Sequence, residues 1–474
     1  MDPGEFRRVG HAIVDRLADY FATIESRPLF SNAEPAALAK LFDEPLPEDG
    51  VDAESVLREI EEKLLPHCTH VGHPGYFGLI TPSPLPMGVL GDFIASALNQ
   101  NVGAWTIGPG ATALERQTVR WLTDLAGYGP AAGGNLTSGG MAANFLGLKL
   151  ARDAVTGDRA QHAGVDGRFA VYASEERHVS VDKAVDAVGL GREAVRALPT
   201  DYAFRLRLEA LEEAIGRDQA EGIRPLCIVG MAGTTNTGSV DDLVALRRIA
   251  DREGMWLHVD AAYGGGMLLS RRKPGILEGL AAADSITIDP HKWFFAPLDA
   301  GAILVKDAAH LLRSFGMKPA YLTDEADADE ARYQYYVHGF EQSRRFRSLK
   351  IWMSFKRYGT LQIGRWIDQN VLQAERLYSL AAADPEFRPA TPPAMSAVCL
   401  RYEPKGIDEA RLGPLHAQVA RRIEAAGRFW ISTTAMKGLT WFRINPVNFR
   451  TRLSHIDALF AELRAECRRV AAQR

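Results

Sequence analysis

The chain has 474 residues, and at about 150 residues per domain this length predicts two to four domains. Its residues are 46% hydrophobic and 24% charged, which is typical of a globular protein and excludes a disordered or fibrous one. Lysine and arginine number 55 against 59 acidic residues, and this near-balance argues against a protein dedicated to binding nucleic acid.

The four cysteines are widely spaced and form no CxxC pair, so we expect a reducing compartment rather than a disulfide framework. The N-terminus lacks the apolar core of a secretory signal. No stretch reaches the roughly 18 apolar residues of a membrane span. These features predict a cytoplasmic enzyme that binds neither membrane nor nucleic acid.

The first predicted element is a helix at the N-terminus. Asp2 suits the N-cap, Pro3 suits the first turn, and apolar residues then recur at helical spacing. Turns rich in proline and glycine follow, and helical periodicity returns over 112–127. We assign residues 1–85 to an N-terminal helical segment.

Short β-rich runs separated by helical stretches follow from about residue 168. The runs are RFAVYAS, PLCIVGMAG, WLHVDAAY, SITIDPHKW and AGAILVK. Strands that alternate with helices predict βαβ units, and therefore a mainly parallel sheet with helices on both faces. Because ligands collect at the carboxyl ends of such strands, we expect the chemistry just after these runs. We assign residues 86–380 to this large domain.

Two later stretches lack clear periodicity. Residues 318–343 are acidic and then tyrosine-rich, and we expect a long mobile loop there. The prolines of 384–396 separate a C-terminal domain, which we place at 381–474. Its runs SAVCLRYEP and LTWFRINPV, together with a final helix, predict a small α+β layer.

The first candidate for catalysis is Lys292, in the run IDPHKWFF. It closes an apolar strand and precedes three aromatic residues. Because burial disfavours the charged amine, such a lysine can act as a nucleophile, as a Schiff-base lysine must. A lysine that merely snorkels at a strand end fits the run equally well.

The second candidate is Asp260, which ends the apolar strand in LHVDAAYGGG. A buried carboxylate needs a cationic or hydrogen-bonding partner, and a protonated pyridine nitrogen would be one. Two other interpretations stay open at this point. Asp260 could cap the next helix, or it could bind a metal together with His258.

A glycine-rich turn carrying Thr137 and Ser138 opens the helical stretch GGMAANFLGLKLARDAV. Backbone N–H groups at a helix start suit a phosphate, and Gly139 and Gly140 permit its close approach, although such a turn often binds nothing. The stretch does not match GxxxxGK[ST], so a nucleoside triphosphatase is disfavoured. The threonine-rich turn GTTNTGS and His178 follow two further strands.

Together these residues supply what pyridoxal phosphate requires: a lysine, an acid for the ring nitrogen, a phosphate cup, a hydroxyl and a stacking ring. The segments DPHKW, LHVDAAYGG, GTTNTGS, HPGYF and SRRFRSLKIW resemble those of the pyridoxal-phosphate-dependent group II amino-acid decarboxylases, in particular the aromatic-L-amino-acid branch. The resemblance implies a fold type I α/β enzyme with a mainly parallel seven-stranded sheet, helices on both faces, an N-terminal helical segment and a small C-terminal α+β domain. It also implies a homodimer with active sites at the interface.

By this resemblance Lys292 holds pyridoxal phosphate in a Schiff base, Asp260 pairs with the ring nitrogen, and His178 stacks on the ring. The further cofactor contacts that it implies are Ser138, Gly139, Gly140, Thr235, Ala262, Asp289 and His291. The substrate contacts that it implies are Tyr76, Phe77, Thr81 and Trp293. The implied reaction converts an L-amino acid, with an aromatic one preferred, to its amine and carbon dioxide through a quinonoid intermediate.

The tyrosine-rich stretch resembles the family's mobile catalytic loop, whose tyrosine protonates the substrate carbon. We assign this role to Tyr336, with Tyr335 as the alternative. The sequence departs from the family pattern in three places. The phosphate cup has Gly139, Gly140 and Met141 where relatives usually place a second hydroxyl and a polar residue. Asp289 stands where many relatives have asparagine, and Gly103 replaces a bulky aromatic residue, which enlarges or reshapes the pocket.

Three other functions remain as alternatives. An aldehyde synthase of the same family couples decarboxylation to oxidation, and its loop tyrosine tends to be replaced. A decarboxylase of an acidic amino acid is the weaker option, because no additional arginine stands out in the pocket segments. A metal-dependent hydrolase would use His67, His70 and His73 with His258 and Asp260, although glycine and proline interrupt any helix there.

Overall fold

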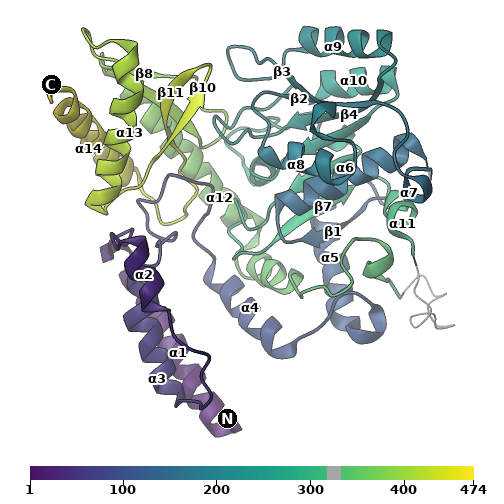
Figure 1. Ribbon diagram of the computed structural model, residues 1–474. Coiled ribbons are helices and arrows are strands. Elements are labelled where there is room, and N and C mark those ends of the chain that lie inside the picture. Colours follow the sequence, from purple (N-terminus) through teal and green to yellow (C-terminus); the bar gives the residue numbers. More distant parts are fainter. Residues whose placement is uncertain (158, 318–331, 474) are drawn as a thin grey trace.

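The predicted first helix is present in the computed structural model, as α1 (Pro3–Thr23). Asp2 caps it by accepting hydrogen bonds from the backbone N–H groups of Gly4 and Glu5. The short helices α2 (Pro35–Leu41) and α3 (Ala53–Glu59) follow. Helices α1 and α3 extend away from the rest of the molecule (Figure 1), and we call residues 3–64 the N-terminal arm. The structure describes residues 1–157, 159–317 and 332–473.

A seven-stranded sheet with the order β1-β7-β6-β5-β4-β2-β3 lies at the centre of the main body. Its strands are β1 (Gly133–Thr137), β2 (Phe169–Ser174), β3 (Val195–Leu198), β4 (Arg224–Met231), β5 (Trp256–Asp260), β6 (Ser285–Ile288) and β7 (Gly301–Val305). Neighbours pair in parallel except at β7, which is antiparallel to both β1 and β6. All strands other than β7 therefore end at the same edge, and the predicted sheet is confirmed.

Helices cover both faces of this sheet (Figure 1). One face carries α6 (Gly140–Thr156), α8 (Val179–Ala187) and α11 (Ala309–Phe315), and the other carries α5 (Pro109–Leu125), α9 (Leu208–Ala220) and α10 (Leu243–Glu253). Successive side chains of a strand point to opposite faces. In β2, Val171 accordingly packs in the core beneath α6, and Tyr172 packs in the core on the other side.

A long helical element, α12 (Ser348–Ala383), leads from the main body to the C-terminal layer (Figure 1) and is interrupted at Gly359, where φ is 68° and ψ is 164°. That layer is an antiparallel sheet in the order β10-β11-β9-β8, packed against two helices of its own and the end of α12. Its elements are β8 (Phe387–Pro389), β9 (Val398–Tyr402), α13 (Glu409–Ala426), β10 (Ser432–Met436), β11 (Leu439–Ile444) and α14 (Leu453–Ala471). The division of the chain after residues 85 and 380 stays a prediction. Within the described ranges, no helix combines the length and apolar character needed to cross a bilayer.

The five predicted strand runs correspond to β2, β4, β5, β6 and β7, whereas β1 and β3 were not predicted. Local propensity does not predict β1, because this strand begins with two glycines and glycine has a low strand propensity. A Cβ on Gly134 would lie 2.2 Å from the carbonyl oxygen of Ile303 in β7. Close approach of these two strands therefore requires glycine, and the pairing with β7 outweighs the local propensity.

Candidate active site

The shared edge of the sheet brings the predicted cofactor residues together. Asp260 is the last residue of β5 and is 5% exposed. Its Oδ1 accepts a hydrogen bond from the backbone N–H of Ala262 at 3.0 Å, and its Oδ2 accepts one from the amide of Asn144 in α6 at 2.8 Å. Both carboxylate oxygens are thus held in place, and the orientation of the group is fixed.

Lys292 lies in the turn after β6 rather than closing the strand as predicted. Pro290 has no N–H to donate, which ends the pairing before the lysine is reached. The Lys292 Nζ is 3.0 Å from Oδ2 of Asp289, and His291 Nε2 is 3.7 Å from the same oxygen. The carboxylate that replaces the expected asparagine is therefore paired with a cation.

The predicted phosphate cup is the turn between β1 and α6. Gly139 begins α6 without a side-chain cap, so backbone N–H groups of the first turn stay available to a ligand. A Cβ on Gly140 would lie 2.8 Å from Asp289 Oδ2 and 3.2 Å from Ala262 Cβ, and one on Gly139 would lie 3.1 Å from His291 Cε1. Glycine thus lets this turn lie directly against the ends of β5 and β6. Ser138 is exposed beside it.

His178 lies at the N-terminus of α8, where the charges of Asp260 and Lys292 both act on its ring. Although the residue is exposed in the single chain, desolvation by its neighbours lowers the pKa of the imidazole, which Asp260 opposes and Lys292 reinforces. Its Nδ1 lies 2.8 Å from the hydroxyl of Ser180, which in turn accepts a hydrogen bond from Asn144. The ring is therefore neutral at neutral pH and linked to the carboxylate of Asp260.

A buried arginine lies beside the threonine-rich turn after β4. Arg443, in β11, donates hydrogen bonds to the carbonyl oxygens of Thr235 at 2.7 Å and Gly78 at 2.9 Å. It is 3% exposed, and its Nη2 has no hydrogen-bond partner among the described residues. A buried guanidinium with an unused N–H group suits an anionic ligand such as a carboxylate.

Sequence reasoning missed both Arg443 and Asn144. Arg443 lies in the apolar run LTWFRINPV, which was interpreted only as a strand, and an arginine inside such a run was the available sign. Asn144 is a polar residue within the first turns of an apolar helix, and a buried polar side chain there requires hydrogen-bond partners.

The predicted substrate residues near the N-terminus separate into two groups. Tyr76 forms a hydrogen bond with Thr81. Burial raises the pKa of the Tyr76 hydroxyl, and the hydrogen bond from Thr81 and the positive charge of Arg443 both oppose this increase. Phe77 is fully buried and stacks on Phe429 in the core of the C-terminal layer. Tyr76 and Thr81 thus lie on the side of the Arg443 guanidinium. Phe77 instead packs in the core and supports the segment that carries them.

Trp293, the fourth predicted substrate residue, is 1% exposed. Its ring stacks on Tyr263 with 4.9 Å between centroids, and its Nε1 donates to Asn370 Oδ1 at 3.1 Å. These are core contacts, and they fix the segment that carries the preceding Lys292. A direct contact between Trp293 and substrate stays a prediction.

The two candidate loop tyrosines form a short 3₁₀ turn, η10 (Tyr335–Val337), and both are buried. The ring of Tyr335 lies 4.2 Å from the guanidinium of Arg344, and the backbone N–H of Tyr336 donates to the carbonyl of Gly103 at 2.9 Å. A Cβ on Gly103 would lie 2.3 Å from the carbonyl oxygen of Gln342, so the close approach of these segments requires glycine, and its effect on the pocket stays a prediction. Residues 318–331 of the predicted mobile loop lie outside the described residues, and the identity of the proton donor stays a prediction.

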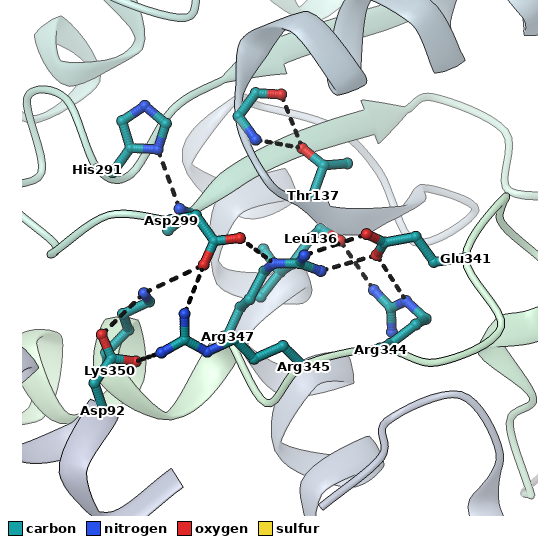
Figure 2. Close-up of polar contacts among 12 residues, drawn as sticks. Asp92, Leu136, Thr137, His291, Asp299, Glu341, Arg344, Arg345, Arg347 and Lys350 are labelled. Atoms are coloured by element: carbon teal, nitrogen blue, oxygen red, sulfur yellow. Dashed lines mark hydrogen bonds and ion pairs between the residues drawn. The ribbon is translucent and has the colours of Figure 1, made fainter. Parts of the chain in front are cut away.

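The basic run at 344–350 holds the loop between β6 and β7 in place (Figure 2). Arg345 and Arg347 both bind Asp299 of that loop, at 3.0 and 2.9 Å. Lys350, whose side chain is fully buried, binds Asp92 of α4 (Pro86–Leu98) at 3.1 Å. This ion cluster therefore joins α4 and the start of α12 to the segment that carries the candidate lysine.

Two contacts beside this cluster involve the segment after β6 and the strand that leads to the phosphate turn (Figure 2). His291 Nδ1 accepts a hydrogen bond from the backbone N–H of Ala300 at 3.1 Å, so the other ring nitrogen is free to act as a donor. Arg344 pairs with the fully buried Glu115 of α5 and donates to the carbonyl of Leu136 in β1 at 3.0 Å. The position of the cup thus depends on charges from distant parts of the chain.

The histidines of the alternative metal site have separate partners. His67, His70 and His73 lie 2.8 Å from the Ser31 hydroxyl, 3.1 Å from the Tyr20 hydroxyl and 3.2 Å from the Glu25 carbonyl, respectively. His258 instead faces Asn144 beneath the sheet edge. In the ranges that the structure describes, no three histidine, cysteine or acidic residues are grouped to hold a metal ion.

Comparison with known proteins agrees with the family that the sequence motifs resemble. A family model described as the pyridoxal-dependent decarboxylase conserved domain matches residues 35–403. The chain is similar to the aromatic-L-amino-acid decarboxylase of Bacillus atrophaeus, with 31% identity over 97% of this chain and 95% of that protein. It is also similar to the phenylacetaldehyde synthase of Petunia hybrida, with 32% identity over 96% and 93%. Its fold is similar to the crystal structure of Oryza sativa TDC with PLP and tryptamine, with a TM-score of 0.93, 26% identity and 99% of both chains covered.

Proposed function

Because the chain belongs to the family of pyridoxal-phosphate-dependent amino-acid decarboxylases, we propose that it converts an aromatic L-amino acid to its amine and carbon dioxide. Decarboxylation with pyridoxal phosphate follows from the family, and the aromatic preference is our inference from the named relatives. The observation that carries the proposal is the convergence of Lys292, Asp260 and His178 at one edge of the sheet, beside the glycine turn.

The described residues fit pyridoxal phosphate. The uncapped start of α6 offers backbone N–H groups to a phosphate, and Gly139 and Gly140 present no side chain there. Lys292 presents a primary amine on a side chain that is 25% exposed, and Asp260 presents an oriented carboxylate. When bound, the cofactor supplies an electron sink for the charge left at the α-carbon as carbon dioxide departs.

The side chains around this site have distinct tasks in the proposal. Asp260 keeps the ring nitrogen of the cofactor protonated, because a carboxylate favours the charged form of a neighbouring base. His178 covers the ring as a neutral imidazole. Arg443 supplies a buried positive charge that suits the carboxylate of an amino-acid substrate. Because every L-amino acid carries this carboxylate, Arg443 does not by itself select the substrate's side chain, so the test includes acidic substrates.

A panel of aromatic and acidic L-amino acids tests the proposal, with carbon dioxide, amine, aldehyde and hydrogen peroxide measured together. We expect carbon dioxide and amine from an aromatic substrate, and no turnover and no visible cofactor absorption in Lys292→Ala. Lys356→Ala, which changes an exposed lysine of α12, is the control and should keep both properties. Failure to release carbon dioxide from any member of the panel would contradict the proposal.

The similarity to the petunia phenylacetaldehyde synthase favours one second candidate, an aldehyde synthase that consumes oxygen. The same panel separates the two functions. Amine without hydrogen peroxide supports the decarboxylase, whereas aldehyde and hydrogen peroxide in place of amine support the synthase. Tyr335 and Tyr336 favour the former, because synthases of this family tend to lack the loop tyrosine.

We further propose that the enzyme acts as a homodimer with its active sites at the interface. The N-terminal arm and α4 leave a large amount of apolar surface uncovered on a single chain, which is typical of an interaction surface. The exposed apolar residues include Phe6, Val14, Leu17, Val56 and Ile60 in the arm and Leu90, Phe93, Ile94 and Leu98 in α4. A second copy of the chain is the partner that this surface would bind.

The proposed compartment is the cytoplasm. All four cysteines, Cys68, Cys227, Cys399 and Cys467, are unpaired, and three of them are buried. Unpaired cysteines are typical of proteins in a reducing environment.

A further inference from the structure

The side-chain amide of Asn144 is the junction of a buried hydrogen-bond network behind the site. Asn144 is 1% exposed. Its Nδ2 donates to Asp260 Oδ2 and to Ser180 Oγ, both at 2.8 Å. Its Oδ1 accepts from the Thr287 hydroxyl at 2.7 Å and faces His258 Nε2 at 3.0 Å. Because an amide oxygen can only accept, the proton of His258 is on Nε2.

The position of this proton determines which atom donates and which accepts in each hydrogen bond from Trp256 to Asp260. His258 is fully buried, and desolvation lowers the pKa of its imidazole, so the ring is neutral. Its Nδ1 is then an acceptor and receives a hydrogen bond from the hydroxyl of Ser285 at 2.8 Å. The Ser285 oxygen accepts in turn from Trp256 Nε1 at 2.9 Å. Each donor from Trp256 onward therefore points toward the carboxylate of Asp260.

A second branch of the network reaches His178. The Ser180 hydroxyl accepts from Asn144, so its own proton can bond His178 Nδ1 at 2.8 Å. The backbone N–H of Ser180 also donates to this nitrogen, at 3.2 Å. A neutral His178 therefore carries its proton on Nε2. One amide thus orients both the acid and the ring histidine of the candidate site.

Gly147, one turn further along α6, keeps this amide within reach of β5. A Cβ on Gly147 would lie 2.4 Å from Cε1 of His258. Residues three apart lie on the same side of a helix. A side chain at this position would therefore push away the same helix face that carries Asn144.

From these contacts we propose that Asn144 is a positioning residue of the decarboxylase. Its amide fixes the orientation in which Asp260 meets the cofactor and, through Ser180, sets the tautomer of His178. This inference rests on the roles that the proposed function gives to Asp260 and His178. Removal of the amide should therefore change the cofactor's affinity and titration even in a chain that folds.

The test compares Asn144→Ala, Asn144→Asp and Asp260→Asn in the full-length protein reconstituted with pyridoxal phosphate. Asn144→Asp keeps the shape of the side chain but replaces its NH2 group, and with it both N–H donors, by an acceptor oxygen, so it remains informative if the alanine variant fails to fold. We expect the dissociation constant of the cofactor to rise about 10- to 100-fold, the range found when a partner that orients a ligating group is removed. We also expect the pH titration of the visible absorption to shift in the same direction as in Asp260→Asn.

Asn448→Ala is the matched control. Asn448 is likewise 1% exposed, and it donates to the carbonyl oxygens of Gly72 and His73, at 3.0 Å each. This variant should lower the Tm while leaving the cofactor's affinity and titration unchanged. Wild-type affinity and titration in the Asn144 variants that fold would overturn the inference. An unchanged titration in Asp260→Asn would instead overturn the assignment of Asp260, so the two failures are distinguishable.

Discussion

Lys292 Nζ lies 3.0 Å from Oδ2 of Asp289, a carboxylate whose side chain is 1% exposed. This oxygen also faces the glycine turn, since a Cβ on Gly140 would lie 2.8 Å from it. The carboxylate of Asp289 therefore forms an ion pair with the lysine before the cofactor binds. It also places a negative charge close to any phosphate held at the turn. The replacement of the expected asparagine by aspartate thus has an electrostatic consequence.

Asp289→Asn is expected to tighten the binding of pyridoxal phosphate by roughly tenfold, because a negative charge close to the phosphate is removed. The same change should lower the stability of the cofactor-free enzyme, since the charge of Lys292 loses its partner. Titration of the cofactor-free protein with pyridoxal phosphate measures the first effect. Asp251→Asn, whose side chain is 68% exposed on α10, is the control. Weaker binding by Asp289→Asn would contradict the expected repulsion.

Glu115→Ala is expected to reduce the free energy of unfolding by about 3–5 kcal/mol, because the buried guanidinium of Arg344 loses its close partner and keeps only Glu341, 3.9 Å away. Helix α5 also offers the control. Asp124 pairs with Arg120 at 2.8 Å on the surface, with both side chains about half exposed. Asp124→Ala should cost less than about 1 kcal/mol. Urea unfolding of the two variants measures both values, and similar losses would show that the buried pair has no special role.

Acid should destabilise the fold through its buried histidines. Burial lowers the pKa values of His70, His73, His258 and His416. Below the ordinary value of about 6.5 the unfolded chain binds protons at these residues and the folded chain does not, so stability is full above that pH and is lost as the pH falls.

Urea midpoints between about pH 7 and pH 5 measure this loss. His416→Gln should make the fall less steep, whereas His11→Gln, which changes an exposed residue of α1, should leave it unchanged. A urea midpoint that stays constant over this range would count against the prediction.

Phe93→Glu is expected to weaken the proposed dimer, because it places a charge on the uncovered apolar face of α4. Phe93 is 46% exposed in the single chain. Sedimentation or light scattering at several protein concentrations measures the mass. Tyr202→Glu is the control, since Tyr202 is 81% exposed outside the arm and α4. A wild-type enzyme that is monomeric and fully active would argue against the homodimer.

Local sequence patterns predicted a large part of this molecule. The apolar run WLHVDAAY becomes β5, and Asp260 is its last residue, as the pattern indicates. The glycine turn before α6 was predicted from composition, because only glycine allows a backbone to lie this close to its neighbours. The strand β1 escaped prediction, because its glycines serve a close approach to β7 that no local pattern encodes.

The sequence by itself determined the alternation of strands and helices, the strand end at which Asp260 stands and the choice of Lys292, although the place of this lysine in a turn was not predicted. Hydrophobic periodicity and turn chemistry act over a few neighbouring residues, so they can be read along the chain. The tertiary structure alone decided that Asn144 binds Asp260, that Arg344 binds Glu115 and that Arg443 reaches the turn of Thr235. These partners are separated by more than a hundred residues, and only the packing of α6, α5 and β11 against the sheet brings them within hydrogen-bonding distance.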